Sequence, residues 1–168
     1  YLLRRELPYL FGLVLTDKCN LDCFYCESKN TGRYHMSFQQ VKDLLCKAYE
    51  RGHRALYFTG GEPMIWEDAG HTVDDLVEFA GNLGFFDIYI YTNGTKPLKT
   101  KGCKYIVTVD GPREIHNSIR QGTFDLVLHN INNAVTKQVL ASITFSQANS
   151  AYLKQYVKEL SSNGFSGR

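Results

Sequence analysis

The sequence lacks any apolar run that approaches the roughly 18 residues of a membrane span. Its amino end lacks the charged, apolar and small-residue pattern of a signal peptide. A net charge of +2 shows no excess of either sign, so the charge balance gives no reason to expect a nucleic acid as partner. No low-complexity tract, charge block or long linker divides the 168 residues. We therefore expect one domain over residues 1–168, without a membrane span.

Cysteine is also scarce, with five residues, and an odd number is poor material for the disulfide framework of a secreted protein. Three of the five lie within eight residues, which leaves Cys46 and Cys103 isolated along the chain. We interpret these two as structural or incidental thiols, because a free cysteine commonly behaves as a small buried hydrophobe. The cysteine usage favours the reducing environment of the cytoplasm.

The clustered cysteines, Cys19, Cys23 and Cys26, have the spacing C-x3-C-x2-C and directly follow an apolar run at residues 9–16. A structural zinc site normally needs four side-chain ligands, and a fully protein-ligated iron–sulfur cluster needs four thiolates. Three thiolates on one loop suit a four-iron cluster with one iron open to something other than protein. The alternative is a zinc site that a fourth residue such as His35 closes.

Apolar runs and amphipathic stretches alternate along the chain. The runs predict strands over residues 9–16, 55–59, 88–92, 105–110 and 139–146. A short segment with room for a turn or two of helix follows the third strand. Strands that alternate with helices predict right-handed βαβ units around a parallel sheet.

Helix starts and inward faces can be placed from capping residues and apolar spacing. Two capping boxes are expected, at Ser37 with Gln40 and at Thr72 with Asp75. Thr123 is the expected cap of a fourth-unit helix. The helices are predicted to end near glycines, and their inward faces are Val41, Leu44, Leu45 and Ala48; Val73, Leu76, Val77 and Ala80; Phe124, Val127, Leu128, Ile131 and Ala134; and Leu153, Tyr156, Val157 and Leu160.

Polar motifs follow four of the predicted strands, at the point where each strand ends. They are the cysteine loop, Thr-Gly-Gly-Glu-Pro at residues 59–63, Thr-Asn-Gly at 92–94 and Asp-Gly-Pro at 110–112. The carboxyl ends of parallel strands meet at one edge of a sheet, where functional groups gather. We expect the four motifs to form one site.

C-x3-C-x2-C with an aromatic pair before the last cysteine, followed by the Gly-Gly-Glu-Pro element, resembles the radical S-adenosylmethionine (SAM) superfamily. The resemblance implies a partial (βα)6 TIM-like barrel, of which about five βα units are present. Because a sixth strand is expected near Arg168, we expect the last strand and any C-terminal extension to be absent from this chain.

The resemblance also implies the cofactors and the residues that hold them. Cys19, Cys23 and Cys26 would bind a 4Fe–4S cluster, and its open iron would take the amino and carboxylate groups of SAM. The implied SAM contacts are Gly60, Gly61 and Glu62 to the amino group, Thr92 and Asn93 to the ribose or carboxylate, Asp110 at the ribose side, Arg120 to the carboxylate and the backbone of Tyr25 to adenine.

The step from Asp110 through His116 to Arg120 is similar to a subgroup that includes molybdenum-cofactor cyclases, anaerobic sulfatase-maturing enzymes and SPASM-type peptide-modifying enzymes. We interpret His116 as an orienting residue. Asn149 is expected to contact adenine or to cap a helix. The lysines at positions 96, 99, 101 and 104 indicate a solvated loop or, alternatively, a docking patch for an acidic electron donor or an anionic substrate.

The implied activity is that of an oxygen-sensitive cytoplasmic enzyme, in which the reduced cluster cleaves SAM to a 5′-deoxyadenosyl radical that abstracts hydrogen from a substrate. The implied partners are a low-potential electron donor, such as a ferredoxin or flavodoxin, and a substrate. A peptide is slightly favoured over a nucleoside, a lipid precursor or another small metabolite. A zinc-binding interaction module and an inactive scaffold are the alternatives of another class.

Overall fold

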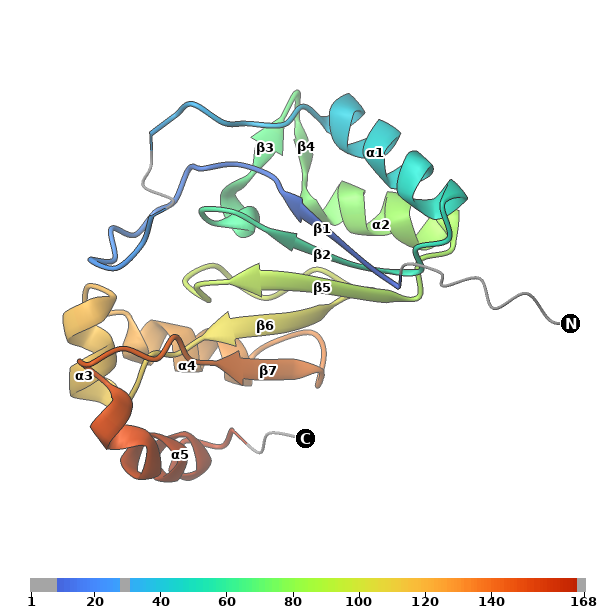
Figure 1. Cartoon of the computed structure of the whole chain (residues 1–168). Coiled ribbons are helices and arrows are strands. Elements are labelled where there is room, and N and C mark those ends of the chain that lie inside the picture. Colours follow the sequence, from blue (N-terminus) through green and yellow to red (C-terminus); the bar gives the residue numbers. More distant parts are fainter. Residues whose placement is uncertain (1–8, 28–30, 166–168) are drawn as a thin grey trace, which may run out of the picture.

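The computed structural model describes residues 9–27 and 31–165. Its main sheet consists of five parallel strands in the order β1-β2-β5-β6-β7, so strands that follow one another along the chain pair with each other (Figure 1). The strands are β1 (Leu10–Val14), β2 (Ala55–Thr59), β5 (Asp87–Thr92), β6 (Lys104–Thr108) and β7 (Val139–Ser142). This arrangement confirms the predicted parallel α/β class.

In the described residues, five α-helices connect and follow the strands: α1 (Phe38–Glu50), α2 (Val73–Leu83), α3 (Arg113–Ile119), α4 (Phe124–Asn132) and α5 (Leu153–Ser162). Both predicted capping boxes are present, at Ser37 with Gln40 and at Thr72 with Asp75. The left-handed backbone of Gly84, with φ of 104°, ends α2 as predicted. Two short 3₁₀ turns, Pro63–Ile65 and Ser150–Tyr152, lie outside these helices.

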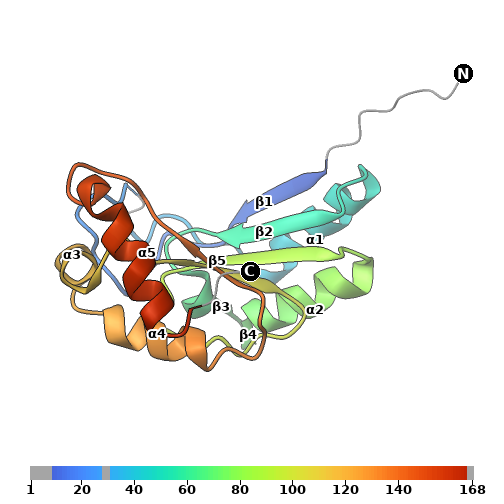
Figure 2. The same ribbon diagram turned by 90° about the horizontal axis from the view of Figure 1, so that it is seen from below.

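The core lies between the helices and one face of the sheet. Alternate strand residues point to opposite faces, and those on the helix side, such as Leu56, Phe58, Ile90 and Val107, are fully buried. The helices α1, α2 and α4 lie along the sheet on this side, whereas α3 lies beyond the carboxyl ends of the strands (Figure 2). The opposite face of the sheet carries Tyr57 and Tyr91. Tyr91 is 39% exposed, so this face is open to solvent at that position.

Several predicted elements differ from the structure. Residues 93–103 contain no helix, although a turn or two was expected there, and α3 was not predicted. A small hairpin also precedes α2; its strands, β3 (Glu67–Asp68) and β4 (His71–Thr72), have two residues each. The last strand ends at Ser142 instead of Ser146, because the Thr144 N–H donates to Asp110 Oδ1 and so leaves the sheet.

The last two helices also correct details of the prediction. Thr123 precedes α4 but makes no capping hydrogen bond; its hydroxyl donates to the Arg120 carbonyl, and Asn117 Oδ1 accepts from the Phe124 N–H instead. On α5, Tyr156 and Leu160 are buried as predicted, whereas Leu153 and Val157 are 43% and 55% exposed. None of the helices in the described ranges is long and apolar enough to cross a membrane.

Candidate functional site

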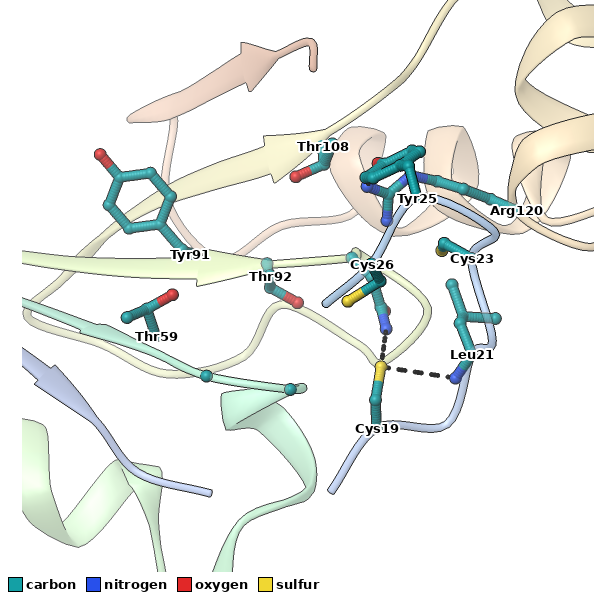
Figure 3. A pocket seen from close by; sticks show the side chains of 13 residues that line it. Cys19, Leu21, Cys23, Tyr25, Cys26, Thr59, Tyr91, Thr92, Thr108 and Arg120 are labelled. Carbon is teal, nitrogen blue, oxygen red and sulfur yellow. Dashed lines mark hydrogen bonds between the residues drawn. The ribbon is translucent and has the colours of Figure 1, made fainter. Parts of the chain in front are cut away.

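A cavity of about 190 Å³ lies where the cysteine loop meets the carboxyl ends of β2, β5 and β6 (Figure 3). Nine of the sequence-predicted site residues line it: Cys19, Cys23, Tyr25, Cys26, Gly60, Gly61, Thr92, Asn93 and Arg120. The other two, Glu62 and Asp110, are fully buried beside it. The four motifs therefore form one site, as their positions after strands predicted.

Two further lining residues, Leu21 and Thr59, belong to the predicted motifs, whereas Tyr91 and Thr108 lie outside them. Thr108 is the last residue of β6, so the rule that functional groups gather at the carboxyl ends of strands would have found it. Tyr91 precedes Thr92 and points to the open face, which only the strand alternation indicates.

The first cysteine is held by polar groups from its own loop and from the loop after β5. Cys19 Sγ accepts hydrogen bonds from the Leu21 N–H at 3.4 Å and from Asn93 Nδ2 at 3.7 Å. Asn93 Nδ2 also donates to Asn20 Oδ1 at 2.9 Å, which joins the cysteine loop to the loop after β5. Burial raises the pKa of the Cys19 thiol, and the hydrogen bond from Leu21 opposes that effect. Asn93 thus orients the first thiol of the motif.

The glycine motif packs against the cysteine loop through its backbone. The Gly61 N–H donates to the Thr16 carbonyl and the Glu62 N–H to the Lys18 carbonyl, both at 2.8 Å. A Cβ on Gly61 would lie 2.1 Å from the Lys18 oxygen, and one on Gly60 would lie 2.3 Å from the Thr16 oxygen. Gly60 has a φ of +140°, which side-chain-bearing residues rarely adopt. The glycines therefore permit this close backbone contact, in addition to lining the cavity.

Glu62 connects the ends of two strands. Its side chain is fully buried; Oε1 accepts from Thr92 Oγ1 at 2.7 Å and from the Met64 N–H, and Oε2 accepts from the Asn93 N–H at 2.7 Å. Burial raises the pKa of the carboxyl group, while these hydrogen bonds lower it. The structure thus places the Glu62 carboxylate behind the cavity wall, where it fixes Thr92 and Asn93.

A buried ion pair lies on the other side of the cavity. Arg120 Nε donates to Asp110 Oδ2 at 2.5 Å, and the two side chains are 9% and 0% exposed. The hydroxyl of Tyr25 lies within hydrogen-bond distance of both. Burial raises the pKa of the Cys23 thiol, whereas the nearby Arg120 charge lowers it. Arg120 is the only charged residue that lines the cavity within the described part of the chain.

His116 supports this ion pair from behind. Its Nδ1 accepts from the Asp110 N–H at 3.2 Å, so the proton of the neutral ring lies on Nε2, which faces Thr123 Oγ1 at 3.1 Å. Burial, helped by the Arg120 charge, lowers the pKa of His116 to about 4, although Asp110 acts in the opposite direction. His116 is a buried orienting residue, which agrees with its interpretation from the sequence.

We expect this histidine to make the protein acid-sensitive. The unfolded chain binds the proton at a pKa of about 6.5 and the folded protein only at about 4, so the stability contribution is complete above the first value and is lost as the pH falls toward the second. The free energy of unfolding should decrease by about 3 kcal/mol over this range. Urea unfolding at several pH values measures it. His116→Gln should remove this slope, and a change at the exposed His129 should retain it.

The side chain of Asn149 connects two segments at the carboxyl ends of the strands. The side chain is fully buried; its Nδ2 donates to the Asp110 and Thr144 carbonyls, and its Oδ1 accepts from the Ser146 N–H. It makes no helix-capping hydrogen bond and does not line the cavity. Asn149 therefore holds the end of β6 and the segment after β7 together.

The four lysines of residues 96–104 do not share one position. Lys96 directly follows Thr95, whose Oγ1 accepts from Asn20 of the cysteine loop. Lys99 and Lys101 border a groove with Phe85 and Ile88, near the amino end of β5, whereas the cysteine loop meets the carboxyl end of that strand. Lys104 Nζ pairs with Asp87 Oδ1 at 2.8 Å. The positions of Lys99, Lys101 and Lys104 favour a solvated loop over a docking patch.

The ring nitrogens of His35 are both engaged. Nδ1 lies 3.2 Å from Thr16 Oγ1, and Nε2 lies 3.1 Å from the Glu67 carbonyl, so the imidazole is not placed to complete a zinc site. Within residues 9–27 and 31–165, no three His, Cys, Asp or Glu side chains gather around a single-ion position. Three thiols spread around a cavity fit a wider, multi-iron group better than one ion.

The remaining cysteines lie elsewhere. Cys46 is half-buried on α1, and the buried Cys103 donates to the Thr100 carbonyl. Burial raises the pKa of Cys103 to about 12, so its thiol stays protonated at neutral pH. Neither lines the cavity, and all five cysteines are free of disulfides.

Comparisons with known proteins agree with this site. A GTP 3′,8-cyclase of Clostridium perfringens is 29% identical over 154 residues, which covers 83% of this chain and 46% of the relative. A probable GTP 3′,8-cyclase of Methanothermobacter thermautotrophicus is 35% identical over 85 residues, which covers 49% of this chain and 27% of the relative. The chain thus spans less than half the length of these curated relatives.

Solved structures share the fold. Streptococcus suis SuiB bound to the precursor peptide SuiA matches 94% of this chain and 38% of its own with a TM-score of 0.73 and 16% identity. SuiB bound to S-adenosylmethionine matches with a TM-score of 0.71. The model of the radical SAM superfamily matches residues 13–146, from β1 past the end of β7. The chain therefore belongs to the radical SAM superfamily, as the order of its motifs after the strands predicted.

Proposed function

We propose that this chain is the core of a radical SAM enzyme, with residues 1–168 as one domain. The superfamily uses a 4Fe–4S cluster and SAM. We assign the cluster to Cys19, Cys23 and Cys26, because their thiols line one cavity to which the described residues add no other thiol, imidazole or carboxylate. When bound, the cluster supplies the electron that cleaves SAM to methionine and a 5′-deoxyadenosyl radical, which takes hydrogen from the substrate.

The side chains around the cavity suggest how SAM is held. Arg120 offers positive charge to the SAM carboxylate, and the backbone of Gly60 and Gly61 offers carbonyl groups to its amino group. Glu62 acts through Thr92 and Asn93, whose positions it fixes by hydrogen bonds. Asp110 acts through Arg120 in the same way. We thus propose that the lining residues contact SAM and that the two buried carboxylates, Glu62 and Asp110, orient those residues.

The open face of the sheet is suited to binding an uncharged part of a substrate. The rings of Tyr57 and Tyr91 meet edge to face with centroids 5.4 Å apart, and Thr59 and Thr108 continue this face into the cavity. Gly12 is required beneath Tyr57, because a Cβ there would lie 2.2 Å from the tyrosine ring. The ring pair and the hydroxyl groups form a surface for stacking and neutral hydrogen bonds.

Charge on this face argues in the same direction. The strand register places Asp87 and Lys104 on it, and these two neutralise each other at 2.8 Å. No other charged residue occupies the described strand positions of the face. We therefore favour a peptide or another small, uncharged group over these strands, whereas a triphosphate would need unpaired cations there. A lipid precursor is the alternative with the same lack of charge.

The proposed partners follow from the chemistry. The cluster needs a low-potential donor such as a ferredoxin or flavodoxin, and cysteines that form no disulfide suit the reducing cytoplasm.

Anaerobic reconstitution of the chain with iron and sulfide tests the proposal. We expect a brown protein that absorbs near about 400 nm and that forms 5′-deoxyadenosine from SAM after reduction with dithionite. A colourless protein that binds zinc instead would overturn the assignment, and a brown protein without SAM cleavage would indicate an inactive scaffold. Added GTP should leave the cleavage rate unchanged, since the open face offers a triphosphate no unpaired cation.

A further inference from the structure

The hydroxyl of Tyr25 connects three segments that are far apart in the sequence. Tyr25 lies between the second and third cysteines of the motif; its hydroxyl donates to Asp110 Oδ2 and accepts from Arg120 Nη2, both at 2.5 Å. Asp110 follows β6, and Arg120 follows α3. The ring of Tyr25 and the guanidinium lie close together at the cavity (Figure 3). The cysteine loop is thereby tied to the end of β6 and to α3.

These contacts determine which part of Arg120 is offered to a ligand. A guanidinium carries five N–H donors in a fixed planar arrangement. Asp110 binds Nε and Tyr25 binds Nη2, so the protein itself uses this edge. The remaining donors are left for a ligand in the cavity that Arg120 lines. Without the tyrosine hydroxyl, Asp110 alone would hold the guanidinium.

A second contact lies beside the first. Gln121 has a positive φ of 57°, which is unusual for a residue with a side chain, and its Oε1 accepts from the Asp22 N–H at 3.2 Å. Residues 120 and 121 therefore contact the cysteine loop at two places. Backbone strain of this kind persists where the surrounding structure enforces it, and such places gather at functional sites.

We propose that Tyr25 is a positioning residue of the cofactor site, whose hydroxyl orders the cysteine loop and aims Arg120 before any cofactor binds. This inference rests on the proposed function. The aromatic ring alone does not explain the contact, because a phenylalanine would keep the packing against Phe24 and the guanidinium. The hydroxyl adds the bond that joins the loop to the buried ion pair.

Tyr25→Phe tests the hydroxyl without changing the ring. In the metal-free protein, we expect the backbone amides of residues 19–26 to exchange with deuterated water about tenfold faster, since a hydrogen bond to a charged group is lost. In the reconstituted protein, iron content should stay at the wild-type level, and the SAM dissociation constant from equilibrium dialysis should rise about tenfold.

Tyr89→Phe is the matched control. The hydroxyl of Tyr89 also donates to a carboxylate, Asp87 Oδ2 at 3.0 Å, but at the amino end of β5 and away from the cysteines. We expect neither readout to change in this variant. Unchanged SAM affinity in a fully iron-loaded Tyr25→Phe protein would overturn the inference. If the wild type itself holds no iron and binds no SAM, the proposed function fails, and unchanged amide exchange in Tyr25→Phe would then also overturn the ordering of the loop.

Discussion

Replacement of any one of Cys19, Cys23 and Cys26 by Ala is expected to abolish both the brown colour of the reconstituted protein and the cleavage of SAM. All three thiols line the cavity, and no further thiol, imidazole or carboxylate in the described part of the chain lines it to replace a lost ligand. Two thiolates are too few to hold a four-iron cluster. Iron content, visible absorption and the yield of 5′-deoxyadenosine measure the effect.

Cys46→Ala is the control for this experiment. Cys46 is half-buried on α1 and does not line the cavity, so iron content and cleavage should match the wild type. An alanine fills most of the space of a cysteine, so we expect the ligand variants to keep the fold. The melting temperature of the metal-free protein measures whether they do. SAM cleavage that survives in any of the three ligand variants would contradict the cluster assignment.

The sequence predicted the repeating units because helix and strand periodicities are local. The capping boxes at Ser37 and Thr72 formed as expected, and the polar motifs met at one edge of the sheet because parallel strands share a direction. The helix α3 was not predicted, since residues 113–119 carry no clear apolar periodicity. The cap of α4 was misplaced because its acceptor, Asn117, comes from that preceding helix.

The direction of polar side chains could not be predicted in the same way. The motif assigns Glu62 a contact to SAM, but it does not show that the carboxylate accepts hydrogen bonds from Thr92 and Asn93, about thirty residues later along the chain. The open face of the sheet was also hidden, because β2 has the sequence Ala-Leu-Tyr-Phe-Thr, in which apolar residues occupy both faces. Tyr57 and Tyr91 form a surface beside the cavity that the sequences of these strands alone do not reveal.

Asp110→Asn is expected to cost the fold about 3–5 kcal/mol, because it removes the counter-charge of a buried arginine. Asp110 is fully buried, and its carboxylate accepts from Arg120, Tyr25 and the Thr144 N–H. An asparagine has the same shape, but its NH2 group would point N–H donors at groups that are themselves hydrogen-bond donors. Urea unfolding measures the change, which is a large part of the about 5–15 kcal/mol by which a domain is usually stable.

Asp87→Asn is the matched control, since Asp87 pairs with Lys104 at a place where the two side chains are 16% and 34% exposed. This pair is less buried than that of Asp110 and Arg120, so its loss should cost less than theirs. Equal losses in the two variants would contradict the role of burial. If the Asp110 variant still folds at low temperature, its Arg120 is held by Tyr25 alone, and SAM affinity should fall at least as far as in Tyr25→Phe. The ion pair thereby links the stability of the fold to the arrangement of the cofactor site.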